Sequence, residues 1–480
     1  MMIIFIAIYT YQCFAVFGYE DPIAKKKILR NQNRVMFMIH FMAFAGMYFK
    51  IGENKILIFY LAQVLLLVAI ILLYGKVYPK VSRLIVNNMC MLLTIGFIMI
   101  TRLSYDKAVK QCIIVAGAAL LSLLVPAIIR KAKGLAEFRI LYAFVGLVAL
   151  AAVVIIGQVS GGAKLGFTIA GIGIQPSEFV KILFVFFVAS SFYRSTRFKN
   201  VVITTIVAAM HVLILVVSKD LGAALIIFAV YLVMLYVATR QPVYTFVGIG
   251  AGSVAAVVAY YLFSHVRVRV HVWKDPFAVY DKGGYQVAQS LFAIGTGSWF
   301  GTGLFQGKAD AIPVADEDFI FSAISEEMGL IFALCMILIC VSCYVMFLNI
   351  AMQLRNRFYK LVALGLGTCY IFQTFLNIGG VTKFIPSTGV TLPLVSYGGS
   401  SVLSTLIMFA IIQGLYILKE DEEESIERKR QQKQAQEDAR QRNRNHIDQS
   451  RTRRREEAGR VSKTQKNGRT GERNKQSRVR

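Results

Sequence analysis

The sequence has few of the residues that build metal and redox centres, and those it has are poorly placed for either. Its 480 residues contain five histidines and seven cysteines. His265 and His271 lie six residues apart, without the spacing of a metal site. Cys340 and Cys343 form a C-x-x-C pair inside an apolar stretch, with no second pair nearby. Buried cysteines of this kind behave as small hydrophobic residues, so cysteine and histidine usage gives no indication of the chemistry.

Long polar stretches are also scarce, which argues against a chain of soluble domains. Hydrophobic residues make up 56% of the sequence, and the mean hydropathy is +0.58. Apolar runs near the ~20 residues needed to cross a bilayer recur along the chain. The thirteen predicted spans are residues 2–18, 35–49, 54–74, 86–102, 111–129, 137–157, 178–194, 200–217, 220–239, 243–263, 329–350, 360–380 and 400–418. The second is short. The first has no basic leader and no small-residue cleavage site, so we interpret it as a retained helix.

Basic residues alternate between the loops in a way that orients these spans. Lysine and arginine cluster in every second loop, for example from Lys25 to Lys27 and from Arg130 to Lys133. Because cytoplasmic loops carry the excess of basic residues, we predict an extracellular N-terminus and a cytoplasmic C-terminal tail. Three polar segments, 158–177, 264–328 and 381–399, then lie at the outer face. The chemistry of the protein is therefore expected there.

The C-terminal segment, residues 419–480, contains almost no large apolar side chains. It opens with the acidic run from Glu420 to Glu424 and becomes rich in arginine, glutamine and lysine, with Arg451 to Arg455 near its middle. Such a segment cannot bury a core, so we predict a disordered tail. Beside a membrane, its basic residues favour contact with anionic plasma membrane lipids or a cytoplasmic partner over binding to nucleic acid.

The densest group of carboxylates lies between the long polar segment and the apolar run that begins near Leu330. Asp316, Glu317 and Asp318 are consecutive, and Glu326 and Glu327 follow. One interpretation is that the three acids cap a helix, because carboxylates satisfy the free N–H groups at a helix N-terminus. The other is that they form a catalytic site on the outer face.

Ionisable groups at membrane depth are costly and therefore functional candidates. Glu178 and Lys181 are three residues apart on one face of a predicted helix, where they can form an ion pair. Asp220 follows a tight turn and is placed to cap the next helix. The segment 384–401 is rich in proline, glycine and hydroxyl groups, and we predict that it lines a cavity. The glycines between Ala293 and Gly303 follow no predicted strand, so they do not indicate a dinucleotide site.

Four motifs occur in a fixed order along the chain. They are Gln-Pro-Ser-Glu at 175–178, Asp-Leu-Gly at 220–222, Asp-Phe-Ile-Phe with Glu-Glu-x-Gly at 318–329, and Pro-x-Thr-Gly with Ser-Tyr-Gly-Gly-Ser at 386–400. Together they resemble the SEDS family (shape, elongation, division and sporulation), which includes FtsW, RodA and SpoVE. The resemblance covers residues 86–418. It implies an all-α integral membrane protein with a ten-span core, preceded by about three extra transmembrane helices in residues 1–85. The outer loop 264–328 falls between the seventh and eighth core spans, as in the family.

The resemblance implies a peptidoglycan glycosyltransferase that polymerises lipid II on the outer face of a bacterial plasma membrane. Asp318 matches the proposed catalytic acid of the family and would act as general base on the acceptor hydroxyl. We predict that Asp316 and Glu317 raise its pKa by like charge. Nearby basic groups would stabilise the departing lipid diphosphate. The predicted substrate-binding residues are Arg269, Lys308, Lys383, Glu178, Lys181, Ser396, Tyr397 and Gln286.

Other expectations follow from the same resemblance. A class B penicillin-binding protein, a transpeptidase, is the expected partner. No cofactor is predicted with certainty, and a divalent cation (Mg or Mn) at the diphosphate is left open. The alternatives are a lipid II flippase, since Glu178 and Lys181 also suit a substrate pathway, and a non-catalytic scaffold for the penicillin-binding protein. The sequence does not distinguish elongation, division and sporulation.

The chain departs from the family pattern at two places. Many members have an Arg-Trp pair before Gln-Pro-Ser-Glu, whereas this chain lacks the tryptophan and has Lys164 near the position of the arginine. Ser218 and Lys219 precede Asp220, where Gln-Pro is common.

Overall fold

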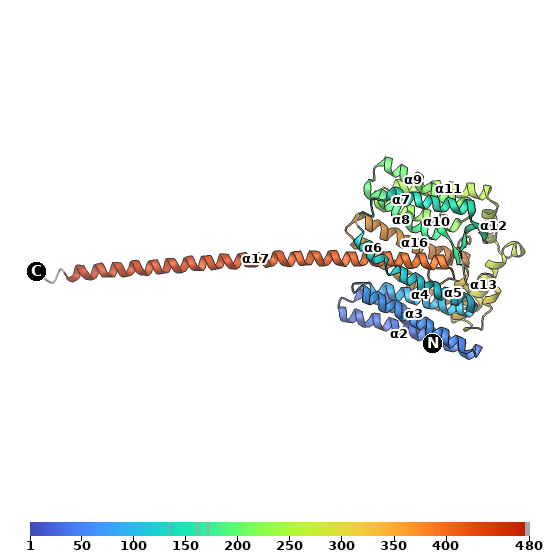
Figure 1. The fold of residues 1–480 in the computed structure, drawn as a ribbon, viewed down its shortest axis with the longest axis horizontal. Coiled ribbons are helices and arrows are strands. Elements are labelled where there is room, and N and C mark those ends of the chain that lie inside the picture. The colour runs from blue at the N-terminus through green and yellow to red at the C-terminus, as the bar shows by residue number, and fades with distance from the viewer. Residues whose placement is uncertain (133, 161–162, 170–171, 476–480) are drawn as a thin grey trace. The chain divides into compact units, whose positions relative to one another are not determined.

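The computed structural model describes residues 1–132, 134–160, 163–169 and 172–475 (Figure 1). Two compact units are present, Met1–Lys419 and Glu420–Arg480. The first unit is built from long apolar helices. Twelve helices in the described part of the chain are long and apolar enough to cross a membrane, and α1, with 17 residues, is shorter. The all-α membrane architecture predicted from the hydropathy is confirmed.

Each predicted span overlaps at least one helix. The N-terminal helices are α1 (Met2–Gly18), α2 (Pro22–Ile51) and α3 (Asn54–Val77). The helices that follow are α4 (Arg83–Leu103), α5 (Tyr105–Ser122), α6 (Val125–Lys131), α7 (Arg139–Ile156), α8 (Pro176–Arg194), α9 (Phe198–Val217), α10 (Leu221–Thr239) and α11 (Pro242–Leu262). The last spans are α15 (Leu330–Gln353), α16 (Arg357–Val381) and the start of α17 (Gly399–Lys475).

Two of the predicted spans have different limits in the structure. The short second span, 35–49, is part of α2, which has 30 residues, because the basic residues after Asp21 continue the helix instead of preceding it. Asp21 caps this helix by accepting hydrogen bonds from the N–H groups of Ile23 and Ala24. The span 111–129 is divided between α5 and α6 beside Pro126, whose missing N–H interrupts helical hydrogen bonding.

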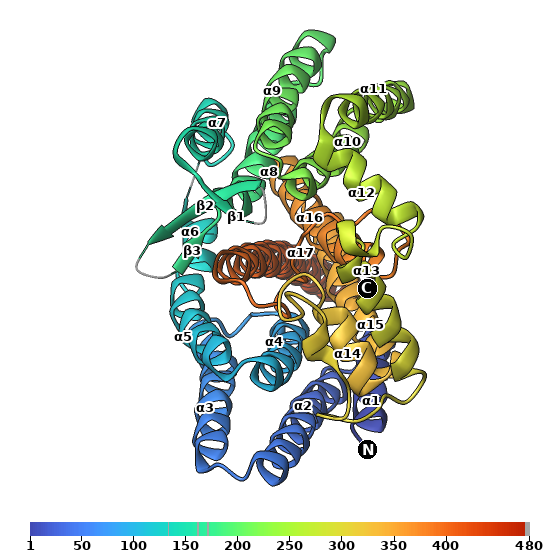
Figure 2. The same ribbon diagram turned by 90° about the vertical axis from the view of Figure 1, so that its right-hand side faces the viewer.

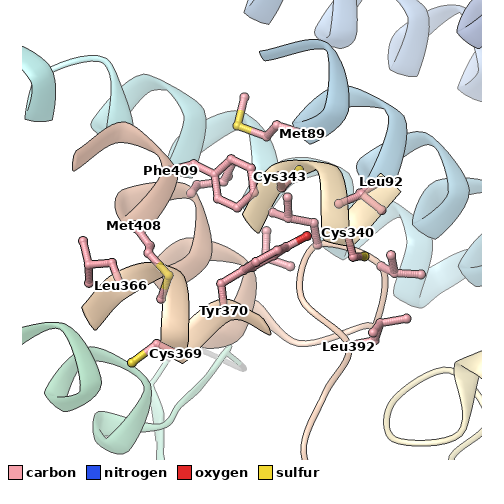
Figure 3. Packing of buried hydrophobic residues seen from close by; sticks show 14 of the residues in the cluster. Met89, Leu92, Cys340, Cys343, Leu366, Cys369, Tyr370, Leu392, Met408 and Phe409 are labelled. Carbon is pink, nitrogen blue, oxygen red and sulfur yellow. The ribbon is translucent and has the colours of Figure 1, made fainter. Parts of the chain in front are cut away.

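Helix α4 and the first turns of α17 lie in the interior of the first unit. Figure 2 looks along the helices and shows α4, α5, α8 and α16 around α17. Tyr370 packs against Phe409 with their ring centroids 5.3 Å apart, and Cys340 and Cys343 are buried in the same cluster (Figure 3). The C-x-x-C pair is thus part of the apolar packing, as predicted.

The N-terminal helices pack directly on the core. Helix α1 contacts α15, and α2 contacts α4. The Tyr9 hydroxyl donates a hydrogen bond to Asn88 Oδ1 (3.1 Å), and Asn88 Nδ2 donates to Ser342 Oγ (3.2 Å), so three helices share one buried polar group. Polar contacts of this kind hold membrane helices together where the hydrophobic effect does not. The N-terminal helices and the core therefore lie in one compact unit. The predicted division of the chain near residue 85 stays a prediction.

A small sheet follows α7, where the sequence analysis expected only a polar loop. Its antiparallel strands are β1 (Gln158–Ser160), β2 (Ala163–Ile169) and β3 (Ile172–Ile174), in the order β1-β2-β3. Gln158 pairs with Gly166, and Phe167 pairs with Ile174. The side chain of Lys164, considered above as a substitute for the family arginine, lies outside the described part of the structure.

The long polar segment before α15 is mostly folded into short helices. They are α12 (Ser264–Lys274), η1 (Tyr280–Lys282), α13 (Tyr285–Gly297), η2 (Ala309–Ala311) and α14 (Ile320–Met328). Within the first unit, α12 and α13 lie at one end of the helices (Figure 1).

The three polar segments predicted for the outer face meet one another at this end. Tyr397 N–H donates to the Asp316 carbonyl (2.7 Å), Arg269 donates to the Ser387 carbonyl (2.8 Å), and Ser400 Oγ donates to the Gly173 carbonyl (2.9 Å). They therefore lie at the same end of the helices.

The side chains described in the second unit are exposed or half-buried, as expected of a tail that cannot bury a core. Helix α17 continues from the first unit to Lys475. Glutamate, glutamine, lysine, arginine and alanine are strong helix formers, and pairs such as Arg428 with Glu424 (3.3 Å) add support at i,i+4 spacing.

Candidate active site

The three consecutive acids do not cap a helix. Helix α14 begins at Ile320, its N-cap residue is Phe319, and no side chain caps it. Helix α15 follows Gly329, again without a side-chain cap. The capping interpretation is therefore wrong for Asp316, Glu317 and Asp318. It is correct for Asp220, whose carboxylate accepts a hydrogen bond from the N–H of Ala223 at the start of α10 (3.1 Å).

Asp318 is held by its backbone, and its carboxylate is left free. Asn377 on α16 donates Nδ2 to the Asp318 carbonyl (2.8 Å) and to the Val390 carbonyl (2.6 Å). Within the described residues, no protein group donates a hydrogen bond to the carboxylate of Asp318. A Cβ atom added to Gly389 would lie 3.3 Å from Asp318 Oδ2 and 3.8 Å from Arg269 Nη2. The loop that carries Gly389 thus faces both the acid and the guanidinium.

The surroundings make Asp318 a weaker acid than a free aspartate. Burial raises its pKa to about 6; ionised Glu317 adds to the increase, and Arg269 opposes it. The direction agrees with the prediction, but burial is the largest cause and Asp316 is not among the causes. A carboxylate with a pKa near 6 is well suited to accept a proton at neutral pH.

Arg269 projects from α12 between acidic groups. Its Nη1 donates to the Ser387 carbonyl. Burial lowers the pKa of Arg269, and the negative charges of Asp318 and Asp220 oppose that decrease. Of the predicted diphosphate-binding residues, Arg269 is the one that the structure brings beside Asp318.

Lys383 and Lys308 are placed by backbone contacts. The Lys383 carbonyl accepts a hydrogen bond from Trp273 Nε1 on α12 (3.2 Å), so its backbone is near the helix of Arg269. Lys308 is exposed, and its N–H donates to Glu326 (2.8 Å). Gln286 is exposed at the start of α13.

Ser396 and Tyr397 contact the acidic segment through its backbone. Ser396 Oγ donates to the Glu317 carbonyl (2.6 Å), and Tyr397 N–H donates to the Asp316 carbonyl. Ser396 Oγ also accepts a hydrogen bond from the Leu392 N–H (2.8 Å), so both its donor and an acceptor site are used within the protein. These contacts give both residues a structural task; their predicted contact with substrate stays a prediction.

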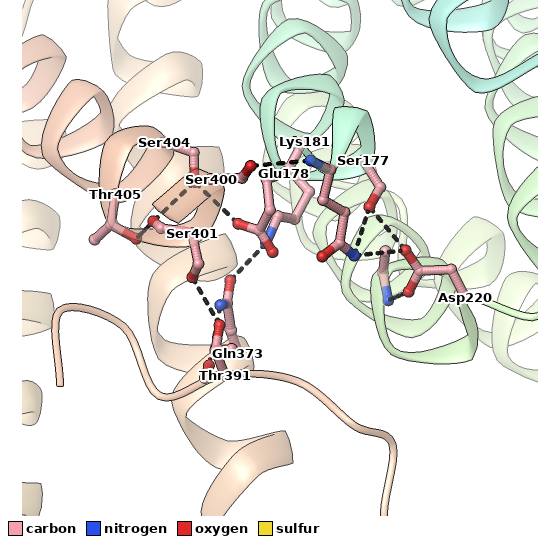
Figure 4. A network of polar contacts seen from close by, with 12 residues as sticks. Ser177, Glu178, Lys181, Asp220, Gln373, Thr391, Ser400, Ser401, Ser404 and Thr405 are labelled. Carbon is pink, nitrogen blue, oxygen red and sulfur yellow. Dashed lines mark hydrogen bonds and ion pairs between the residues drawn. The ribbon is translucent and has the colours of Figure 1, made fainter. Parts of the chain in front are cut away.

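Glu178 and Lys181 form the predicted ion pair (3.0 Å), deep among the helices (Figure 4). Lys181 also donates to Gln373 Oε1 on α16 (2.6 Å), and Ser404 on α17 donates to Glu178 Oε2 (2.9 Å). Both side chains are buried. The pair therefore joins α8 to α16 and α17, with protein partners on each charge.

Two basic residues that the sequence analysis did not select hold the acidic segments in place. Arg102, at the end of α4, lies 2.9 Å from Glu327 and 3.3 Å from Asp310. Lys107, in the first turn of α5, lies 2.6 Å from Asp316 and 3.5 Å from Glu317. The pairs are more than 200 residues apart in the sequence, so no local pattern indicates them. Among the described residues, no group of three His, Cys, Asp or Glu side chains is arranged to hold a metal ion.

The sequence of this chain resembles those of known proteins. The family model of FtsW, RodA and SpoVE, described as cell cycle protein, matches residues 82–420. The chain belongs to this family. The FtsW/RodA/SpoVE resemblance found in the four motifs is thereby confirmed, and so is the assignment as a multi-pass membrane protein.

Relatives in the family have similar length and sequence. The chain is 34% identical over 361 residues to peptidoglycan glycosyltransferase RodA of Mycobacterium leprae, which covers 70% of this chain and 77% of the relative. It is 31% identical over 283 residues to the probable peptidoglycan glycosyltransferase FtsW of Aliivibrio salmonicida, covering 56% of this chain and 70% of the relative.

Solved structures share the fold. One is a chain from a peptidoglycan synthase complex described as coordinating polymerization and crosslinking, with a TM-score of 0.61 and 22% identity. It covers 71% of this chain and 98% of that chain. Another is the rod shape determining protein RodA of Thermus thermophilus, with a TM-score of 0.54 and 20% identity, covering 70% of this chain and 96% of that chain.

Proposed function

We propose that this protein is a peptidoglycan glycosyltransferase that polymerises lipid II at the outer face of the plasma membrane, with Asp318 as general base. The observation that carries the proposal is the free carboxylate of Asp318, with a pKa raised to about 6, facing Arg269 across Gly389. Curated relatives that are 34% identical over most of the chain bear the name of this activity.

The proposed reaction is one displacement at the anomeric carbon of the donor, in which both charged groups take part. Asp318 takes the proton of the acceptor sugar hydroxyl while the oxygen attacks the anomeric carbon of the donor. The bond from that carbon to the lipid diphosphate breaks, and its electron pair leaves with the diphosphate. Arg269 stabilises the negative charge that develops there. Protonated Asp318 returns its proton to water after the new glycosidic bond has formed.

The orientation in the membrane is part of the proposal. The distribution of basic residues in the loops puts the tail in the cytoplasm, the N-terminus outside and the end that carries Asp318 outside. The three polar segments meet at this one end, which supports a single outer site.

We also infer that a class B penicillin-binding protein is a partner. One structure with the same fold comes from a complex described as combining polymerization and crosslinking. Glycan strands made by this chain would need such a crosslinking activity beside them.

The flippase alternative receives less support than the polymerase. A substrate pathway requires charged groups that exchange partners with the substrate. Glu178 and Lys181 instead have protein partners on α16 and α17, at 2.6 Å and 2.9 Å. Asp318, whose carboxylate is free, lies outside the spans.

The test is polymerisation of lipid II by the purified protein, alone and with a class B penicillin-binding protein, compared with Asp318→Asn. Asparagine keeps the size of the side chain but cannot act as a base. We expect glycan strands from the wild type and none from the variant. Full activity of a folded Asp318→Asn variant would remove Asp318 from the mechanism. Transfer of lipid II across vesicles without polymer would favour the flippase, and neither activity would favour the scaffold.

A further inference from the structure

Lys107 contacts two of the three consecutive acids and leaves the third free. Its ammonium group lies 2.6 Å from Asp316 Oδ2 and 3.5 Å from Glu317 Oε1. It also lies 5.2 Å from the centre of the Tyr397 ring, within the range of a cation–π contact. One lysine thus meets the acidic segment and the loop before α17 at the same place.

Helix α5 makes a second contact with this loop one turn further on. Gln111 Nε2 donates to the Ser396 carbonyl (3.1 Å), and its Oε1 accepts a hydrogen bond from the Gly398 N–H (3.3 Å). Lys107 and Gln111 are four residues apart and lie on the same face of α5. Ser396 in turn donates to the Glu317 carbonyl. Both segments are therefore attached to one face of α5.

This attachment separates the three carboxylates. Asp316 and Glu317 are turned toward α5, whereas Asp318 lies beside Gly389 and Arg269 of α12. The charged groups around Asp318 are Asp316 and Glu317 on its own segment, Lys107 from α5, Arg269 from α12, and Asp220 at the start of α10, which acts on Arg269. Lys107 is the cation that contacts Asp316 and Glu317, and Arg269 is the cation beside Asp318.

We propose that Lys107 is a positioning residue: it holds Asp316 and Glu317 against α5 and so fixes both the direction of Asp318 and the affinity of Asp318 for its proton. The proposal rests on the proposed function, in which Asp318 is the base. Lys107 contacts Asp316 and Glu317 and acts on Asp318 through Glu317.

Charge supports the same link. Burial raises the pKa of Glu317 and the positive charge of Lys107 opposes that increase, while ionised Glu317 raises the pKa of Asp318. Without Lys107, Glu317 keeps its proton to higher pH, and the loss of its negative charge lowers the pKa of Asp318. Lys107 and Glu317 are each more than one third exposed, so solvent reduces the effect.

The first experiment compares pH profiles of polymerisation for the wild type, Lys107→Gln, Lys107→Arg and Lys110→Gln. Activity falls on the acid side as the base becomes protonated. We expect Lys107→Gln to move this acid limb downward by roughly half a pH unit or less, and Lys107→Arg to restore it. Lys110 is exposed on the same helix and removes the same charge three residues away, so Lys110→Gln is the matched control and keeps the wild-type profile. An unmoved limb in Lys107→Gln, whatever its rate, would overturn the proposal.

A second pair of variants tests the path through Glu317. Glu317→Gln removes the negative charge next to Asp318, so its acid limb should move downward, in the same direction as that of Lys107→Gln and at least as far. If Lys107 acts through Glu317, the double variant should have the profile of Glu317→Gln alone. A double variant whose limb differs from that of Glu317→Gln would contradict this path.

A chemical measurement separates this inference from the proposed function. Carbodiimides react with a carboxyl group in its protonated form, so the pH dependence of labelling at Asp318, followed by peptide mass spectrometry, reports its proton without any turnover. The labelling curve of Lys107→Gln should lie below that of the wild type, by about half a pH unit or less. If the wild type makes no polymer, the proposed function fails while the labelling still decides the role of Lys107. Coincident curves would refute that role even in an active enzyme.

Discussion

Two carboxylate–cation pairs in this protein differ in what surrounds them. Glu178 and Lys181 are buried within the spans, and protein side chains from two other helices complete the contacts of each charge. Asp318 and Arg269 lie at the end of the helices where the three polar segments meet, and the carboxylate of Asp318 receives no hydrogen bond from the described residues. A charge that is fully bound by protein stabilises a structure. A charge that no protein group binds is available to a substrate.

The largest expected effect is the loss of activity in Asp318→Asn without a loss of stability. General base catalysis contributes about 10²–10⁴-fold, so polymerisation should decrease by at least that range. The melting temperature in detergent should stay at or above the wild-type value, since no protein contact of the carboxylate is removed. A strongly lowered melting temperature would make Asp318 resemble Glu178, and the comparison would no longer hold.

The reverse result is expected at the buried pair. Lys181→Met leaves Glu178 charged and without its cation, and removing one partner of a buried pair costs about 3–5 kcal/mol. Thermal unfolding should show this loss. The double variant Glu178→Gln/Lys181→Met removes both charges and should recover most of the stability. If Lys181→Met is as stable as the wild type but cannot bind lipid II, Lys181 belongs to the substrate path.

A smaller effect is expected for Arg269→Gln, and it has a defined pH dependence. Arg269 lowers the pKa of Asp318, which is about 6 in the wild type. Activity in the wild type should therefore fall as the pH drops through about 6. In the variant this loss should occur at higher pH. Even above pH 8, where Asp318 is ionised, the rate should stay about 10-fold low or more, because the leaving diphosphate has lost a stabilising charge.

The smallest effect is expected for Gly389→Ala. Gly389 has a φ of +70°, and an L-residue in this region costs about 1 kcal/mol. The added methyl group would also point toward Asp318 and Arg269, so the KM for lipid II should rise several-fold. Gly398→Ala in the same loop is the control, since its Cβ would make ordinary contacts at 3.6 Å. Equal KM values in the two variants would argue against the loop facing the substrate.

The sequence predicts what local patterns determine. The spans follow from apolar runs, the Glu178–Lys181 pair follows from helical spacing, and Asp318 follows from its motif. The contacts of Lys107 with Asp316 and of Arg102 with Glu327 have no such pattern, because they join residues more than 200 positions apart. For the same reason, the backbone contacts of Ser396 and Tyr397 were not foreseen.

The chain has two tryptophans, and one of them lies beside the site. Trp273 is on α12, one turn after Arg269, and its indole N–H donates to the Lys383 carbonyl. The emission of the Trp273 indole depends on this hydrogen bond and on nearby charge. The other tryptophan, Trp299, is exposed just after the end of α13. A Trp299→Phe protein would therefore contain a single tryptophan, which can be excited selectively, on the helix that carries Arg269. Its emission would report the arrival of a diphosphate at Arg269 in real time, without a label.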